Sequence, residues 1–379
     1  MTNNENRNVN VGSVASVNGR GVIGSFVDSI SGLRLAIAIM VGYTIAVELI
    51  MWAQNSDTTN SLSSHPYYFA LILKRVAILI TIVIASSAIW MLWKNITGNG
   101  DASTSLTKQL INGWRTHLAK PGPWMRLLII IIFYQPFLGA FSTLKKQISE
   151  INPFSYWDIA FAELDRLLHF GMDPWQITWT LFSNPWATVV IDRLYVSWYS
   201  AVYGTLFAVI LFDNNTQRRA RFIVTHVLLW VLLGSISAIT FSSVGPCFYN
   251  DAIGTQQSFT DLMARLSAVD QQYPLYAIKL QAMLWDGYIG VRPIFEGISA
   301  MPSLHIAQAA LLALYGATIS KKLALILWVY FLIMLIGSVH LGWHYAVDGY
   351  FAAIGTLLIW WFSGILTKNT YMSFGLNKR

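Results

Sequence analysis

The sequence is poor in charged residues and in cysteine. Only 11% of its 379 residues are charged, whereas 55% are hydrophobic. Soluble domains usually carry about 25% charged residues, so this chain lacks the polar side chains that would cover a water-exposed surface. Cys247 is the single cysteine, which excludes an intrachain disulfide and a cysteine-rich metal site. The net charge of +7 fits the basic loops of a membrane protein and does not indicate a nucleic-acid partner.

Long apolar runs are abundant, and they predict an all-α, polytopic membrane protein. A helix needs roughly 20 apolar residues to cross the hydrocarbon core of a bilayer. Runs of suitable length lie at 35–53, 76–93, 127–144, 194–212, 222–241, 303–319, 323–341 and 345–366. We therefore predict one integral helix bundle with about eight transmembrane helices, in which the last six form the core that carries the functional site.

The predicted spans divide the chain into four parts. Residues 1–32 are polar and lack the apolar segment of a signal peptide, so we expect a disordered cytoplasmic tail. Residues 33–125 hold two additional N-terminal spans and a loop. Residues 126–366 form the membrane core, and residues 367–379 form a second cytoplasmic tail.

The connections between spans predict the orientation of the bundle. Residues 145–193 contain an amphipathic pattern that favours a helix lying in the membrane interface, and residues 242–302 are too polar to span. The short loops with Arg218-Arg219-Ala220-Arg221 and Lys321-Lys322 fall on the same side as both termini, which the positive-inside rule places in the cytoplasm. The opposite side is then the periplasmic face of a bacterial inner membrane or the lumenal face of a Golgi-type membrane.

Titratable residues gather at the outer ends of the last three spans. His305 begins the sixth span, His340 ends the seventh, and His344 and Asp348 begin the eighth. Ionisable groups inside a membrane are costly, and each is a candidate functional residue. His226, in the middle of a span, is instead interpreted as a helix-packing residue.

These residue types suit chemistry at phosphorus. His344 and Asp348 are four residues apart, so on a helix they lie on one face within contact range. A carboxylate that accepts one ring N–H of histidine fixes its tautomer and activates the other nitrogen for attack. A second histidine, His305, can protonate the leaving group. Ser303 can cap a helix whose N-terminal N–H groups bind phosphate oxygens.

The motifs resemble those of the type 2 phosphatidic acid phosphatase (PAP2) superfamily. Pro302-Ser303-Leu304-His305 is similar to its second motif, Pro-Ser-Gly-His, and His344-x3-Asp348 to the end of its third, Ser-Arg-x5-His-x3-Asp. The longer segments 297–305 and 342–348 resemble the subgroup containing inositol phosphorylceramide synthase, as does the weaker pattern at 164–174. The resemblance implies that His344 is the nucleophile, that Asp348 orients it, and that His305 is the leaving-group acid, with no cofactor or metal.

The sequence departs from the family pattern at the positively charged residues of the first and third motifs. Gly337-Ser338 stands where the third motif has Ser-Arg, and the nearest match to the first motif, Lys108-x6-Arg115, lies on the cytoplasmic side and is treated as chance. Arg292 lies on the outer side just before the second motif and is the candidate phosphate clamp. His340 is four residues before His344 and either binds phosphate or packs between helices.

A site with fewer cations suits a phosphodiester better than the more highly charged phosphomonoester. We therefore favour transfer of a phosphate-containing head group from a phospholipid to a lipid or sugar alcohol. The alternative is a phosphatase that hydrolyses a phosphomonoester or a polyprenyl (pyro)phosphate. Two less favoured interpretations are a zinc-dependent hydrolase that uses the same His and Asp side chains, and a transporter in which they relay protons.

Overall fold

A computed structural model of the chain describes residues 32–54, 121–154, 156–254, 259–291 and 297–375. The predicted second span at 76–93 and the candidate clamp Arg292 lie outside these residues, as does nearly all of the predicted N-terminal tail.

The described residues form helices joined by turns, with no β-strand among them. In chain order the elements are α2 (Arg34–Ala53), α5 (Pro121–Lys146), α6 (Ile148–Ile151), α7 (Tyr156–Leu168), α8 (Pro174–Leu181), α9 (Pro185–Val196), α10 (Trp198–Phe212), α11 (Thr216–Leu228), the π-helical η2 (Leu229–Ser237), α12 (Ala238–Thr240), the 3₁₀-helical η3 (Pro246–Phe248), α13 (Tyr249–Ala252), α14 (Phe259–Gln272), α15 (Tyr276–Tyr288), α16 (Leu304–Ala317), α17 (Lys321–His340) and α18 (Ala346–Gly375).

Six helical segments in the described part of the chain are long and apolar enough to cross a membrane. They are Arg34–Ala53, Pro121–Lys146, Pro185–Phe212, Thr216–Thr240, Lys321–His340 and Ala346–Lys368. This confirms the predicted all-α membrane bundle. The segment predicted at 194–212 begins earlier, at Pro185, because the Asn184 side chain accepts a hydrogen bond from Trp186 N and proline suits the first helical turn.

Helix α16 is shorter than the other apolar helices and lies among them. The Ser303 hydroxyl accepts a hydrogen bond from Ile306 N and caps its first turn, as predicted. The helix packs mainly against α17 and α18, and most of its residues are buried. The position of His305 is therefore set by packing on several sides.

Apolar side chains remain exposed along the outer faces of α17 and α18. They include Leu325, Ile326, Val329, Leu332, Ile354, Leu357, Leu358, Trp361 and Phe362. Such a continuous exposed apolar face would be unfavourable in water and is expected where helices face lipid.

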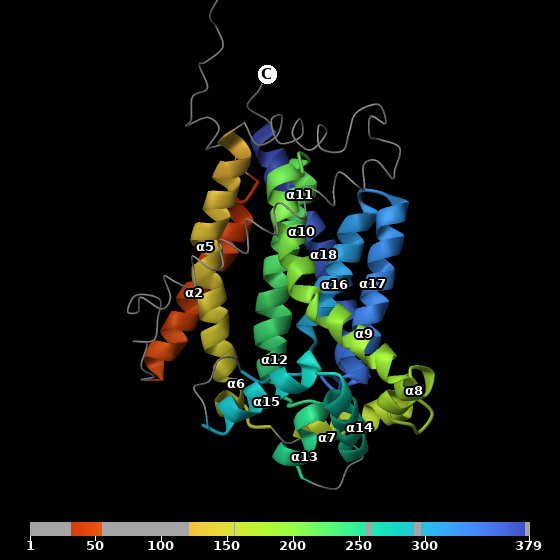
Figure 1. Ribbon diagram of the computed structural model, residues 1–379. Helices are drawn as coiled ribbons and strands as arrows, with labels where there is room; N and C mark the ends of the chain where they lie inside the picture. Colours follow the sequence, from red (N-terminus) through yellow and green to blue (C-terminus); the bar gives the residue numbers. More distant parts are fainter. Residues whose placement is uncertain (1–31, 55–120, 155, 255–258, 292–296, 376–379) are drawn as a thin grey trace, which may run out of the picture.

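The short helices gather at one end of the bundle. In Figure 1, α7, α8, α13, α14 and α15 lie at the lower end, where α16 and α18 begin and α17 ends. The two long connections predicted to be non-spanning thus fold into a helical layer. That layer covers the end of the bundle to which the candidate histidines were assigned.

Candidate active site

Three of the predicted site residues come together at the lower end of the bundle. His344 Nδ1 lies 3.3 Å from Asp348 Oδ2. The rings of His305 and His344 have centroids 6.2 Å apart and are tilted by 56°. Asp348 is completely buried, and His344 retains only 7% of its surface exposed. The geometry therefore agrees with the paired His–Asp and the separate second histidine that the sequence predicts.

The loop between α17 and α18 fixes the position of His344. The backbone N–H groups of Trp343 and His344 both donate to the carbonyl oxygen of Ser338. Tyr345 N donates to Asp348 Oδ2 at 3.0 Å, so this carboxylate organises the backbone of the loop as well as the imidazole. Ser303 N donates to the Asp348 carbonyl oxygen at 3.4 Å, which joins the start of α16 to the first turn of α18.

Aromatic side chains hold the His305 ring. It stacks on Tyr195 with a centroid separation of 5.0 Å and contacts Trp198 at 4.3 Å. The Trp198 indole N–H also donates to the carbonyl oxygen of His305. These partners belong to α9 and α10, more than 100 residues earlier in the sequence. No sequence motif identified them, although Tyr195 and Trp198 are spaced three apart, on one helical face.

Burial controls the protonation of His344. Desolvation lowers its pKa from 6.5 to about 3, a hydrogen bond with the Ala300 backbone opposes this effect, and the positive charge of Lys145 lowers the pKa further. The imidazole is thus neutral at neutral pH, which is the form that has a nitrogen lone pair for attack.

Lys145 was not selected from the sequence as a site residue. It lies in the last turn of α5, and its carbonyl oxygen packs so closely on Gly297 that a Cβ there would clash with it. Gly297 begins the segment that leads to Ser303 and His305. Lys145 acts electrostatically on His344, so its charge lies near the candidate site.

His340 faces a different environment from His344. Its Nε2 and Nδ1 lie 2.9 Å and 3.3 Å from the hydroxyl oxygens of Thr188 and Thr178. The ring stacks on Trp179 with centroids 4.7 Å apart and is completely buried. This arrangement favours the packing interpretation of His340 over phosphate binding, because both ring nitrogens already have partners.

His226 also packs between helices, as the sequence predicted. Its Nε2 lies 2.7 Å from the Tyr134 hydroxyl, and its Nδ1 lies 2.8 Å from Gln308 Oε1. The contact joins α5, α11 and α16, and His226 has no exposed surface.

Two buried carboxylates on α7 support the loop from the other side. Asp165 Oδ2 and Oδ1 accept hydrogen bonds from Ala346 N and Val347 N at 2.8 and 2.9 Å, so Asp165 caps α18. Asp158, which the sequence analysis missed, accepts from Val244 N, Gly245 N and the Tyr345 hydroxyl. A signal was present, because positions 158 and 165 are two helical turns apart on one face.

Burial is also the main influence on these two carboxylates. It raises the pKa of Asp158 to about 6 and the pKa of Asp165 to about 7, while hydrogen bonds from backbone N–H groups oppose both shifts. The nearby charge of Asp348 adds to the effect on Asp165, and His169 reduces it.

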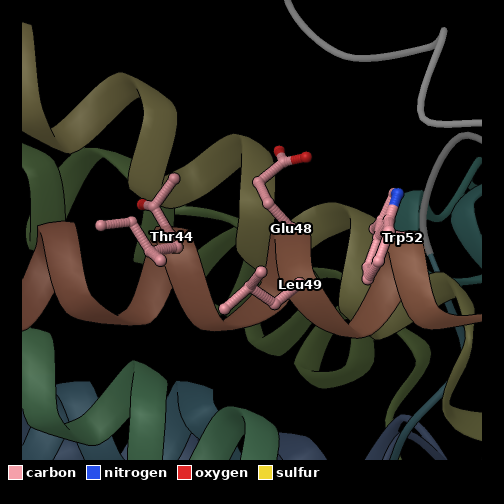
Figure 2. A pocket seen from close by; sticks show the side chains of 5 residues that line it. Thr44, Glu48, Leu49 and Trp52 are labelled. Atoms are coloured by element: carbon pink, nitrogen blue, oxygen red, sulfur yellow. The ribbon is translucent and has the colours of Figure 1, made fainter.

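No cluster of three or more His, Cys, Asp or Glu side chains suited to a metal ion occurs within the described ranges. Figure 2 shows a pocket elsewhere, lined by Thr44, Ile45, Glu48, Leu49 and Trp52 of α2. None of the candidate site residues lines it, and five side chains of one helix do not form an enclosed reaction site.

The fold and this site define an integral membrane protein with a candidate active site at one end of a helix bundle. A family model described as PAP2 superfamily matches residues 159–362, which is more than half of the chain. The chain therefore belongs to the PAP2 superfamily, and this membership supports phosphatase or phosphotransferase chemistry on lipid phosphates. No curated protein and no solved structure matches the chain.

Proposed function

We propose that this protein is a membrane phosphotransferase that moves the phosphate-containing head group of a phospholipid to an alcohol acceptor through a phosphohistidine. The observation that carries the proposal is the 3.3 Å contact between His344 and Asp348, with the His305 ring 6.2 Å from that of His344. Reacting atoms lie roughly 3–3.5 Å apart before a displacement. A phosphorus centre between the two rings suits this separation.

In the first step, the His344 nitrogen that does not face Asp348 attacks phosphorus. An N–P bond forms and the P–O bond to the alcohol of the donor lipid breaks. His305, whose protonated form is favoured by the negative charge of the bound phosphate, gives a proton to the departing oxygen. Asp348 stabilises the positive charge that develops on the imidazole. Its contact with the ring is supported by the bond from Tyr345 N to the same carboxylate oxygen.

In the second step, the acceptor hydroxyl loses its proton to His305 and attacks the phosphohistidine. The new P–O bond replaces the N–P bond and regenerates neutral His344. If water takes the place of the alcohol, the same two steps give hydrolysis. The family supports both reactions equally, and our preference for transfer rests on the charge of the site.

The phosphate oxygens need hydrogen-bond donors and positive charge in the transition state. We assign these roles to the N-terminal turn of α16 with Ser303, to Lys145, and to Arg292. Ser338, which is uncharged, stands where the family motif has arginine. A site with this limited set of cations suits the single negative charge of a phosphodiester better than a phosphomonoester, which carries nearly two.

The proposed site faces the side opposite the basic short loops, hence the periplasm or the lumen. The donor phospholipid then enters from the leaflet on that side. Exposed apolar residues of the α7–α8 region, including Leu167 at 77% and Phe170 at 95%, support contact of this layer with the membrane interface.

An assay with purified protein in detergent and EDTA tests the proposed reaction. Labelled phospholipids and polyprenyl phosphates are supplied with and without alcohol acceptors, with the His344→Ala variant as a control. We expect a new phosphodiester lipid only when an acceptor is present. Free phosphate released by the wild type alone would instead identify a phosphatase.

Arg292 is tested in the same assay. We expect Arg292→Ala to lower activity at least about tenfold, since a charge-assisted contact to phosphate is lost. Activity near that of the wild type would remove Arg292 from the site.

A further inference from the structure

Helix α7 has two faces with opposite character. Asp158, Phe161, Ala162 and Asp165 form its buried face. Asp158 is completely buried and Asp165 is 3% exposed. A buried carboxylate without strong partners is costly, so two of them on one short helix require a structural or functional explanation.

Both carboxylates bind the segments that surround His344. Asp165 accepts from Ala346 N and Val347 N, the first two N–H groups of α18, and Asp348 lies just beyond them. Asp165 thereby fixes the direction in which α18 begins. That direction determines where the Asp348 side chain meets the imidazole.

Asp158 acts on the residue next to His344. It accepts from the Tyr345 hydroxyl at 3.0 Å and from the backbone of Val244 and Gly245. Gly245 has φ +84°, and a Cβ there would lie 2.8 Å from the Trp343 carbonyl oxygen. This segment therefore packs directly against the His344 loop, and Cys247 N adds a hydrogen bond to the Gly342 carbonyl oxygen.

The loop consequently has hydrogen-bond partners at every backbone N–H from position 343 to position 348. Ser338 O accepts from 343 and 344, Asp348 Oδ2 from 345, Asp165 from 346 and 347, and Tyr345 O from 348. Asp165 of α7 accepts two of these bonds from outside the α17–α18 segment. Such complete pairing favours a single conformation of the loop.

We infer that Asp158 and Asp165 are positioning residues that hold the His344–Asp348 pair in its reactive geometry from helix α7. The inference rests on the proposed function of His344. Neither carboxylate needs to touch substrate. Their removal should therefore reduce the rate of the chemical step more than the binding of the donor lipid.

The test compares Asp165→Asn and Asp158→Asn with a matched control, Asp173→Asn. Asp173 is also a buried carboxylate at this end of the bundle, but it caps α8, forms an ion pair with Arg166 and exchanges capping contacts with Gln176. A misplacement of about 1 Å can cost roughly 10²-fold in rate. We expect the first two variants to lose 10- to 100-fold in kcat with KM changed less than about threefold, and Asp173→Asn to keep kcat.

A second readout does not depend on activity. Hydrogen–deuterium exchange of a peptide covering 342–348 should become at least about tenfold faster in Asp165→Asn, while peptides from α11 keep their rates. Tyr345→Phe removes only the hydroxyl contact to Asp158 and should give a smaller loss of kcat. Tyr345→Phe also tests the inference if an aspartate variant fails to fold.

The possible outcomes separate the two proposals. Wild-type kcat and exchange in both aspartate variants, with an inactive His344→Ala, would overturn the positioning inference alone. An active His344→Ala would overturn the proposed function, and the exchange data would still report whether α7 holds the loop. An equal loss of kcat in Asp173→Asn and Asp165→Asn would also overturn the inference. The loss would then follow from removing any buried carboxylate at this end of the bundle.

Discussion

Asp213 at the upper end of the helix bundle and the pair Asp158 and Asp165 at the lower end are buried carboxylates with different kinds of partner. At the upper end, Asp213 pairs with the Arg218 guanidinium through contacts of 2.7 and 2.8 Å and also accepts from the Tyr315 hydroxyl. At the lower end, Asp158 and Asp165 bind backbone N–H groups of loops and helix starts.

Asp192 follows the pattern of the lower end, although an arginine is beside it. It accepts from Tyr276 N and Ala277 N at 2.9 and 2.8 Å and thereby attaches α15 to α9, while also contacting Arg193. Carboxylates that bind N–H groups fix loop geometry without adding a cation for each acid. Asp213 thus joins two helices through an ion pair and a hydroxyl group, whereas Asp158 and Asp165 hold loops and helix starts beside the candidate site; Asp173, which pairs with Arg166, is an exception at the lower end.

The largest expected effect comes from removing His344, the proposed nucleophile at the lower end. His344→Ala should reduce kcat by at least about 10³-fold, because the covalent route is lost and only binding and electrostatic stabilisation remain. The apparent melting temperature in detergent should stay close to that of the wild type. The measurement is steady-state kinetics with matched thermal unfolding, and residual activity within tenfold of the wild type would refute the role of His344.

The next prediction tests whether Lys145, at the lower end, contributes positive charge to the binding of the phosphate. Lys145→Ala should lower kcat/KM about tenfold or more, because a cation near the phosphate is lost. Lys146→Ala is the matched control, since it removes the same charge from the next position of α5. Equal losses of kcat/KM in the two variants would show that the total positive charge of this end matters, and not the position of Lys145.

A substitution at the upper end should lower the stability of the protein and leave kcat unchanged. Asp213→Asn leaves Arg218 and Tyr315 without their shared carboxylate, and removing one partner of a buried pair costs roughly 3–5 kcal/mol. Because the Arg218 side chain remains 29% exposed, we expect a loss toward the lower end of that range. Thermal unfolding should reveal it, while kcat per folded molecule is retained. A large fall in kcat would contradict the division between the two ends.

The smallest expected effect is a change in the pH dependence of stability. The pKa of Asp165 is raised to about 7 in the folded protein by burial and by Asp348, with His169 opposing the shift, against about 4 for an unperturbed aspartate. The folded state therefore binds the proton more tightly. The stabilisation from this group is complete below about pH 4 and is lost as the pH rises to about 7.

The Asp165→Asn variant cannot titrate at this position. The difference in melting temperature between the wild type and this variant should therefore fall between pH 4.5 and 7.5 and then level off. Tyr350 also interacts electrostatically with Asp165. A difference that is independent of pH would show that Asp165 does not titrate in this range.

The sequence was sufficient to predict the membrane bundle and to place the candidate site residues at one end of it. Length and hydropathy identify spans, because a bilayer imposes a minimum length on an apolar helix. Counting the spans then places His305, His344 and Asp348 at one level, and the structure brings them into proximity. These predictions depend only on local pattern and topology.

The supporting residues could not be predicted in the same way. Asp158 binds N–H groups 86 and 87 positions away, and Trp198 donates to a carbonyl oxygen 107 positions away. Such contacts depend on how the long connections fold back across the end of the bundle, which no periodic pattern encodes. The proximity of Lys145 to the candidate site could not be predicted for the same reason, since it depends on packing of α5 against Gly297.

The stereochemistry of the reaction at phosphorus tests the central claim most directly. The measurement uses a donor phospholipid with a chiral phosphorothioate and determines the configuration of the transferred head group. Two successive displacements, first by His344 and then by the acceptor, predict net retention. Net inversion would mean that the acceptor attacks the donor directly, which would contradict a phosphohistidine intermediate.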